Sequence, residues 1–142
     1  MTTGIDVLDS SVQEVNEWLN DMEARLGTTD RKRAYNALKI ALHALRDHVG
    51  RDNAVHLAAQ LPLMIKGIFY ENWQPARTSA RTTQDFVQRG DGAAARGAAV
   101  DIEAAIRAGL DVLVARVNPA QSAKLVRLFP EELRELWPAT VH

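Results

Sequence analysis

The sequence predicts an all-α fold, a helical bundle of about eight helices formed by two tandem, pseudo-symmetric four-helix repeats. Three observations predict it. Apolar residues recur at three- and four-residue steps along most of the chain, as they do on the buried face of an amphipathic helix. No run of β-branched residues alternates at period two, so no strand is expected. The apolar pattern of the first half returns at a constant offset of 68 residues, which indicates duplication of one helical unit.

The matches fall on positions that a shared core would require. Identical residues recur at Leu42 and Leu110, Leu45 and Leu113, Val49 and Val117, Leu57 and Leu125, and Pro62 and Pro130. Similar residues recur at Trp18 and Phe86, Leu38 and Ile106, Leu61 and Phe129, Ile65 and Leu133, and Phe69 and Trp137. Because about 60 residues bury too little surface to be stable alone, we expect the copies to share one core. Residues 1–142 then form a single domain, with repeat one at 10–73, a polar connector at 74–82 and repeat two at 83–138.

The first helix is expected to begin after Asp9 or Ser10, because either side chain can accept hydrogen bonds from free backbone N–H groups. Gly27 is its expected left-handed stop. Its apolar residues are Val12, Val15, Leu19, Met22 and Leu26.

Three more helices complete repeat one. The second is expected between the N-cap Asp30 and the stop Gly50, and the third from Asp52 to about Leu61. Pro62 cannot continue the third helix, but it fits the first position of the fourth.

Repeat two carries similar start signals. Asn118 is expected to cap a helix that begins at Pro119, and Pro130 to lead another helix with two glutamates at its positive end. Three glycines within residues 89–97 truncate the first helix of this repeat. We interpret the Arg-Gly-Asp triplet there as part of a flexible loop.

Composition excludes several classes of function. With 17 basic and 18 acidic residues, the chain lacks the basic excess of a general nucleic-acid binder, so a nucleic-acid partner is not expected. The absence of cysteine excludes disulfides, thiol catalysis and thiolate metal sites. No export signal or membrane-spanning stretch is recognisable, so we expect a cytoplasmic protein without a membrane partner.

The fourth helix of repeat one is apolar on more than its core side. Ile65, Ile68 and Phe69 form the core side, whereas Leu63, Gly67 and Tyr70 lie together on the other, with Met64 beside them. The corresponding residues of repeat two are Glu131, Glu135, Pro138 and Glu132.

Three explanations are open for what covers this extra apolar side: the other repeat, a partner subunit, or a small molecule near Tyr70 and Trp73. Gly67 costs about 1 kcal/mol of helix propensity, so it predicts close approach of another backbone or a ligand.

We expect no catalytic, cofactor-binding or metal-binding residue and no enzyme activity. His43 and Asp47 lie one turn apart and are interpreted as a solvated surface pair. His48 and His56 are expected to be exposed, because long cations fill the corresponding positions of repeat two. A weak candidate anion contact for phosphate or nucleic acid is the set Arg77, Arg81, Arg89 and Arg96.

Four sequence elements are distinctive: Ala41-Leu-His-Ala-Leu-Arg-Asp-His48, Gln60-Leu61-Pro62, Tyr70-x-x-Trp73 and Leu136-Trp137-Pro138 near the end of the chain. Together they resemble a bacterial family catalogued as domain of unknown function 2267. The resemblance covers about residues 10–138. It implies an all-helical cytoplasmic protein and brings no established catalytic residues.

We therefore expect a non-catalytic protein-interaction or regulatory module whose partner is itself or another protein. The candidate surface is Leu63, Met64, Gly67, Tyr70, Trp73 and Trp137. The alternative is a small-molecule-binding protein with a pocket between the two repeats, near Tyr70, Trp73 and Trp137.

Overall fold

The computed structural model describes residues 2–75 and 101–141, and within these ranges it is all-helical, as predicted. Seven α-helices and one short 3-10 helix form there, and no strand does. Their bounds are α1 Asp6–Leu26, α2 Arg31–Val49, α3 Arg51–Ala58, α4 Leu63–Tyr70, α6 Ile102–Arg116, α7 Pro119–Arg127, α8 Glu131–Arg134 and η1 Ala139–Val141. The predicted first helix of repeat two lies outside the described residues.

Side-chain caps begin several helices where the sequence predicts them. Asp30 accepts hydrogen bonds from the backbone N–H groups of Lys32 and Arg33 at the start of α2. Asn118 accepts one from Ala120 at the start of α7. Gly27, at φ 66°, ends α1 in the left-handed conformation that glycine tolerates.

The predicted start of α1 is wrong. The helix begins at Asp6 after Ile5, which supplies no side-chain cap. Asp9 lies inside the helix, where its carboxylate accepts hydrogen bonds from the backbone N–H of Thr3 at 2.8 Å and from the Thr3 hydroxyl at 2.9 Å. The preceding segment folds back onto Asp9, so the helix can start one turn earlier than a capping rule indicates.

Two other helix starts also differ from the predictions. α3 begins at Arg51 directly after Gly50, whose φ of 86° turns the chain sharply enough to make Asp52 a first-turn residue. Pro62 is the N-cap of α4 rather than its first helical residue, with ψ at 156°.

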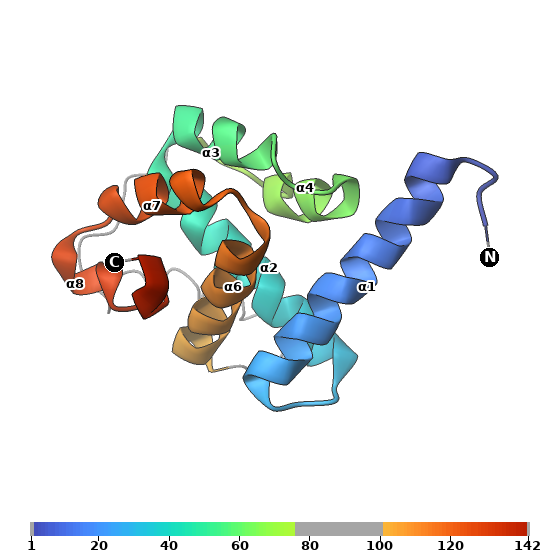
Figure 1. Ribbon diagram of the computed structural model, residues 1–142, viewed down its shortest axis with the longest axis horizontal. Helices are drawn as coiled ribbons and strands as arrows, with labels where there is room; N and C mark the ends of the chain where they lie inside the picture. Colours follow the sequence, from blue (N-terminus) through green and yellow to red (C-terminus); the bar gives the residue numbers. More distant parts are fainter. Residues whose placement is uncertain (1, 76–100, 142) are drawn as a thin grey trace.

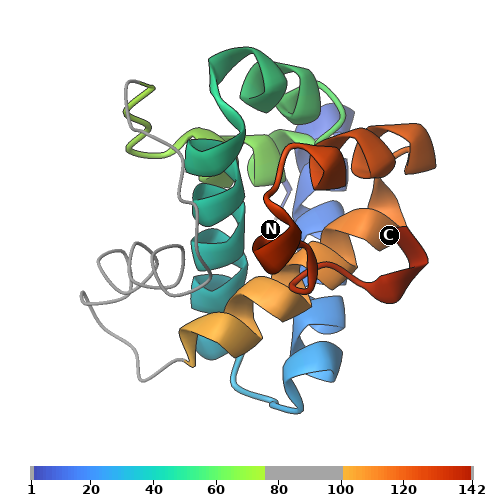
Figure 2. The same ribbon diagram turned by 90° about the vertical axis from the view of Figure 1, so that its left-hand side faces the viewer.

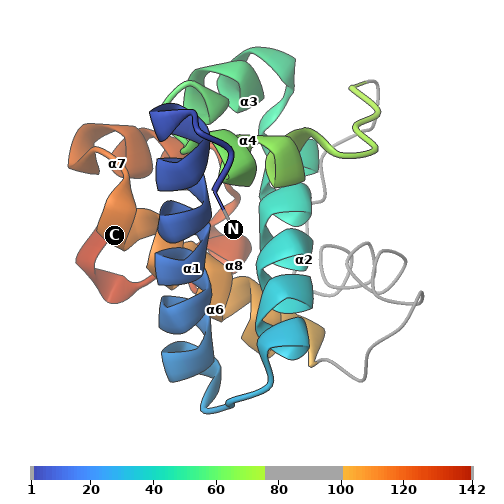
Figure 3. The same cartoon turned by 90° about the vertical axis from the view of Figure 1, so that its right-hand side faces the viewer.

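α1 and α2 diverge from the turn that joins them, and α6 packs against both (Figure 1). α4 crosses the open end between α1 and α2 and contacts both helices (Figure 3). The short helices α3 and α7 lie at the same end of the molecule (Figure 2). This arrangement leaves the N-terminal turns of α1 extending beyond the body.

α2 and α6 make the most extensive helix contact among the described elements. Their facing side chains are fully buried and include Leu38, Leu42, Leu45, Ile106, Leu110 and Leu113. The helices approach most closely at Gly109, where an added Cβ would lie 2.1 Å from the Cβ of Ala41. Only glycine fits there without displacing α2.

Candidate functional site

Leu63 and Met64, at the start of α4, are open to solvent, with 48% and 42% of their surfaces exposed. We call these two residues the α4 surface. On the other side of the helix, Ile65 and Phe69 are fully buried, as predicted, whereas Ile68, the third residue of the predicted core side, is only half-buried. The explanation that the other repeat covers Leu63 and Met64 is therefore wrong.

Among the described residues no other backbone approaches Gly67, so close approach of a partner or a ligand there stays a prediction. Gly67 is exposed, and a Cβ added to it would meet nothing within 4 Å. The glycine that a close helix contact requires is Gly109. Helix periodicity places a glycine on a face but does not tell which neighbour reaches that face, so the two positions were not distinguishable from the sequence.

The three aromatic residues proposed for a pocket do not lie together. Tyr70 and Trp73 are half-buried, with ring centroids 5.5 Å apart. Trp137 is only 2% exposed and packs edge-on against Phe129 at 5.4 Å. No ring contact joins Trp137 to the other two within the part of the chain that the structure describes.

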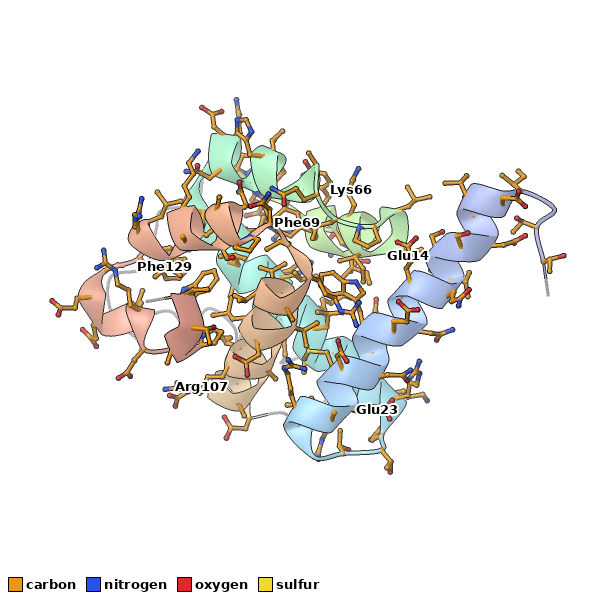
Figure 4. All side chains as sticks on the ribbon, in the orientation of Figure 1. Glu14, Glu23, Lys66, Phe69, Arg107 and Phe129 are labelled. Atoms are coloured by element: carbon orange, nitrogen blue, oxygen red, sulfur yellow. The ribbon has the colours of Figure 1, made fainter. Side chains whose placement is uncertain are left out.

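A cleft of about 320 Å³ lies beside the α4 surface, between α1, the turn before α4, and the end of α6. From α1 it is lined by Glu14, Glu17 and Trp18. Gln60 and Pro62 line it from the turn, and Ala115 and Arg116 from α6. Pro62 directly precedes Leu63, so the cleft reaches the start of α4. Glu14 lies on the side of α1 that faces α4 (Figure 4).

One cation already occupies the inner wall of the cleft. The Arg116 guanidinium lies 5.7 Å from the centre of the Trp18 ring, and its Nε donates to the Asp21 carboxylate at 3.0 Å. Glu17 approaches the same guanidinium at 4.0 Å. Glu14 makes no ion pair with any described residue. The cleft therefore combines an aromatic surface with carboxylates that exceed its cations.

The sequence did not single out Glu14, Glu17, Trp18 or Arg116 as site residues. A signal was present, because α1 carries six acidic residues and only one basic residue. That imbalance has the pattern of a solvated helix face, so only the positions of α4 and α6 reveal that part of it borders a cleft.

The motif residues of α2 hold α4 in place. Arg46 is only 4% exposed, and its Nη1 donates to the backbone carbonyls of Phe69 at 2.9 Å and Glu71 at 2.7 Å. Its Nε donates to Asp47 at 2.9 Å. These hydrogen bonds satisfy the carbonyls that the end of a helix leaves without partners.

The interpretation of His43 and Asp47 as a solvated pair is wrong. His43 Nε2 donates to the carbonyl of Ile68 at 2.7 Å, and Asp47 binds Arg46. Burial lowers the pKa of His43 below its ordinary value, and the nearby guanidinium of Arg46 acts in the same direction. The Ile68 carbonyl and Asp47 oppose this shift without reversing it. A neutral imidazole thus caps α4.

Lys39 extends the same polar cluster to solvent. Its ammonium lies 2.7 Å from the carboxylate of Glu71. This contact raises the pKa of Lys39 and lowers the pKa of Glu71, because each charge favours the other.

The prediction of an exposed His48 is wrong as well. His48 is 5% exposed, and its ring stacks on Phe129 with centroids 4.1 Å apart. The corresponding residue, Arg116, lies over an aromatic ring too, so a long cation in one repeat did not indicate exposure in the other. His56 is exposed, as predicted.

The remaining predicted features concern ions and membranes. Arg77, Arg81, Arg89 and Arg96 lie outside the described residues. Within residues 2–75 and 101–141, no three His, Asp or Glu side chains are grouped to hold a metal ion. None of the helices in these ranges is both long and apolar enough to cross a membrane.

A family model described as "Uncharacterized conserved protein (DUF2267)" matches residues 15–136. No curated protein matches the sequence. The matched range contains the α4 surface, most of the cleft, and the polar residues His43, Arg46 and Asp47 of α2.

Proposed function

The chain belongs to the DUF2267 family, and from that premise we propose that it is a non-catalytic protein-interaction or regulatory module that binds its partner through the α4 surface. The partner is a protein, and the chain contributes a preformed helical surface. Its location in the cytoplasm remains a prediction from the sequence.

One observation carries the proposal. Leu63 and Met64 are adjacent, large and nearly half exposed, although the same helix buries Ile65 and Phe69 completely. Burying a large apolar side chain fully stabilises a complex by about 1.5–3 kcal/mol, so each of these residues offers about half of that to a partner. The corresponding residues of repeat two are Glu131 and Glu132, which shows that a polar side is compatible with a helix in this place.

A non-catalytic role for the protein is supported by the contacts that its buried ionisable side chains make. His43 and Arg46 hold the end of α4 through its backbone carbonyls. His48 stacks inside the core. These histidines thus serve the fold, which favours a binding role over acid–base chemistry.

A second candidate function is small-molecule binding, and the cleft favours it. Its volume of about 320 Å³ is at the lower end for ligand sites, and its lining comes from both halves of the chain. It lies beside Trp18 and Arg116 rather than at the three aromatic residues predicted from the sequence. A co-purified molecule seen by native mass spectrometry, and lost on Trp18→Ala, would favour this candidate.

We also propose that the architecture arose by duplication of one helical unit, and the spacing of the helices supports this. α3 and α7 begin 68 residues apart, at Arg51 and Pro119, as do α4 and α8, at Leu63 and Glu131. Ala41 and Gly109 are also 68 residues apart, and they meet at the crossing of α2 and α6. Under a two-fold relation between copies, residues near the axis contact their own counterparts, so this contact supports the proposed duplication. The duplication supports a division of roles, in which one copy keeps its fourth helix polar and the other presents an apolar surface.

Site-specific photo-crosslinking tests the proposed function. A photoreactive residue replaces Leu63 in cells that produce the protein, and a second strain carries it at Glu131, the corresponding exposed position. We expect a discrete adduct from position 63 that is absent at position 131 and absent when Met64→Glu is added. Adducts of the same mass and yield at both positions would refute the proposal.

A further inference from the structure

The exposed part of α1 is both acidic and apolar. Its first twelve residues include Asp6, Asp9, Glu14 and Glu17 with no basic residue, and the first cation of the helix is Arg25. Val7 and Val12 are exposed among these carboxylates, by 63% and 49%. At about 1.5 Å per residue the helix is about 31 Å long, and its N-terminal turns extend past the body (Figure 1).

The apolar stripe of α1 continues beyond what the fold uses. It has the three- and four-residue steps of a heptad seam and consists of Ile5, Leu8, Val12, Val15, Leu19, Met22 and Leu26. Val15, Leu19 and Met22 are buried, whereas Ile5 and Val12 are about half exposed. The C-terminal part of the stripe is therefore buried in the chain's own core, whereas its N-terminal part is exposed.

The cleft shows which charge this region accommodates. Arg116 lies over Trp18 and against Asp21, so an acidic and aromatic setting already holds one guanidinium. Glu14, on the outer side, has no described cation as partner. Lys66 lies one turn after Leu63 on α4 and projects away from Glu14 (Figure 4). A second cation can therefore reach Glu14 and Glu17 from outside the molecule.

We propose that the surface formed by the N-terminal half of α1, the cleft and the α4 surface binds a basic amphipathic helix of another protein. The inference rests on the proposed function and names the class of partner. The apolar side of the partner packs on Leu63 and Met64, and its Lys or Arg side chains pair with Glu14 and Glu17. This is the helix-in-groove mode with charge complementarity at its rim.

The negative charge of this surface favours a basic helix over a second copy of the chain. Two copies joined through this surface would bring Glu14 and Glu17 of one copy close to the same carboxylates of the other, which is repulsive. An acidic partner is disfavoured for the same reason.

The test uses the full chain and two labelled synthetic helical peptides. One alternates leucine on one side with lysine on the other, and the second has glutamate in place of every lysine. Fluorescence anisotropy measures binding at low and high salt. We expect the lysine peptide to bind, the glutamate peptide not to bind, and the affinity to fall as salt is added.

Three variants distinguish this inference from the proposed function. Glu14→Lys and Leu63→Ser should each weaken binding of the lysine peptide by about fivefold or more, whereas Glu131→Lys, with the same change in net charge on α8, should leave it unchanged. Circular dichroism checks that each variant stays folded.

Several results would overturn the inference. Equal binding of both peptides, no effect of Glu14→Lys, or no binding of the lysine peptide at about millimolar concentration excludes a basic partner, since charged interfaces of this kind exceed that affinity. If Leu63→Ser abolished binding and Glu14→Lys did not, a basic partner would also be excluded, although the α4 surface would remain a docking site. A dimer of the free chain that Leu63→Ser dissociates would replace the basic helix by a second copy.

Discussion

At the scale of single residues, the described polar side chains of α2 explain how α4 is held. Arg46 is buried with its charge balanced by Asp47, and its Nη1 donates to the carbonyls of Phe69 and Glu71 at the end of α4. A buried charge persists only when it is paired and hydrogen-bonded in this way. The Leu-Arg-Asp sequence motif therefore has a structural role, which is to fix the helix that presents Leu63 and Met64.

His43 makes stability depend on pH. Its pKa is lowered from 6.5 in the folded protein, so the unfolded chain binds more protons as the pH falls below that value. The stabilising contribution is complete above about pH 6.5 and is lost as the pH falls through the folded pKa. Glu71, whose pKa is lowered from 4.5, acts only in more acidic solution, and Lys39, whose pKa is raised from 10.5, only in alkaline solution.

We predict that the free energy of unfolding of the wild type falls between about pH 7.5 and pH 5.5, and that His43→Gln removes part of that fall. Urea denaturation at the two pH values measures it. His56→Gln, at an exposed histidine, serves as the control and should keep the wild-type slope. An unchanged slope in His43→Gln would contradict the role given to the buried imidazole.

At the scale of helices, the close contact of Ala41 with Gly109 sets the distance between α2 and α6. Gly109→Ala would place a Cβ 2.1 Å from that of Ala41, which is too close for any two carbon atoms. We predict a loss of about 1–3 kcal/mol in the free energy of unfolding, as for other overpacked cores. Chemical denaturation of the variant measures this loss.

The paired change tests the contact itself. Ala41→Gly removes the atom that Gly109→Ala would meet, so the double variant should recover part of the stability despite a second glycine in a helix. Strict additivity of the two losses would show that the helices do not meet at these residues.

Helix existence was predictable from the sequence, but helix neighbours were not. Caps such as Asp30 and Asn118 act within one turn, so their effect can be predicted from the neighbouring sequence. The start of α1 depends on Thr3 folding back to Asp9, six residues away, and the burial of His43 depends on α4. The apolar extra side of α4 was visible as a pattern, whereas its exposure, and the cleft beside it, depend on where α1 and α6 lie.

At the scale of the whole molecule, the two halves depend on each other. Leu38, Leu42 and Leu45 of α2 are at most 1% exposed because α6 covers them. A fragment of residues 1–75 would expose this apolar surface. We predict that the fragment is molten or dimeric, with weak near-ultraviolet circular dichroism and no cooperative unfolding as a monomer.

The result would be read from sedimentation and denaturation of the fragment together. A monomeric fragment that unfolds in one cooperative transition would show that repeat one folds without repeat two. The shared core would then be dispensable for stability.

The central claim is that folding leaves Leu63 and Met64 exposed and that a partner covers them. The chain has no cysteine, so Leu63→Cys introduces a single thiol, and Val55→Cys, at a position with 49% exposure against 48% for Leu63, is a matched control. The measurement is the rate of thiol labelling, in the dilute purified protein and in the cells that produce it. The account predicts equally fast labelling of both thiols in the purified protein and slower labelling of Cys at position 63 alone in cells. Equal rates at both positions in cells, or protection of position 63 in the purified monomer, would contradict it.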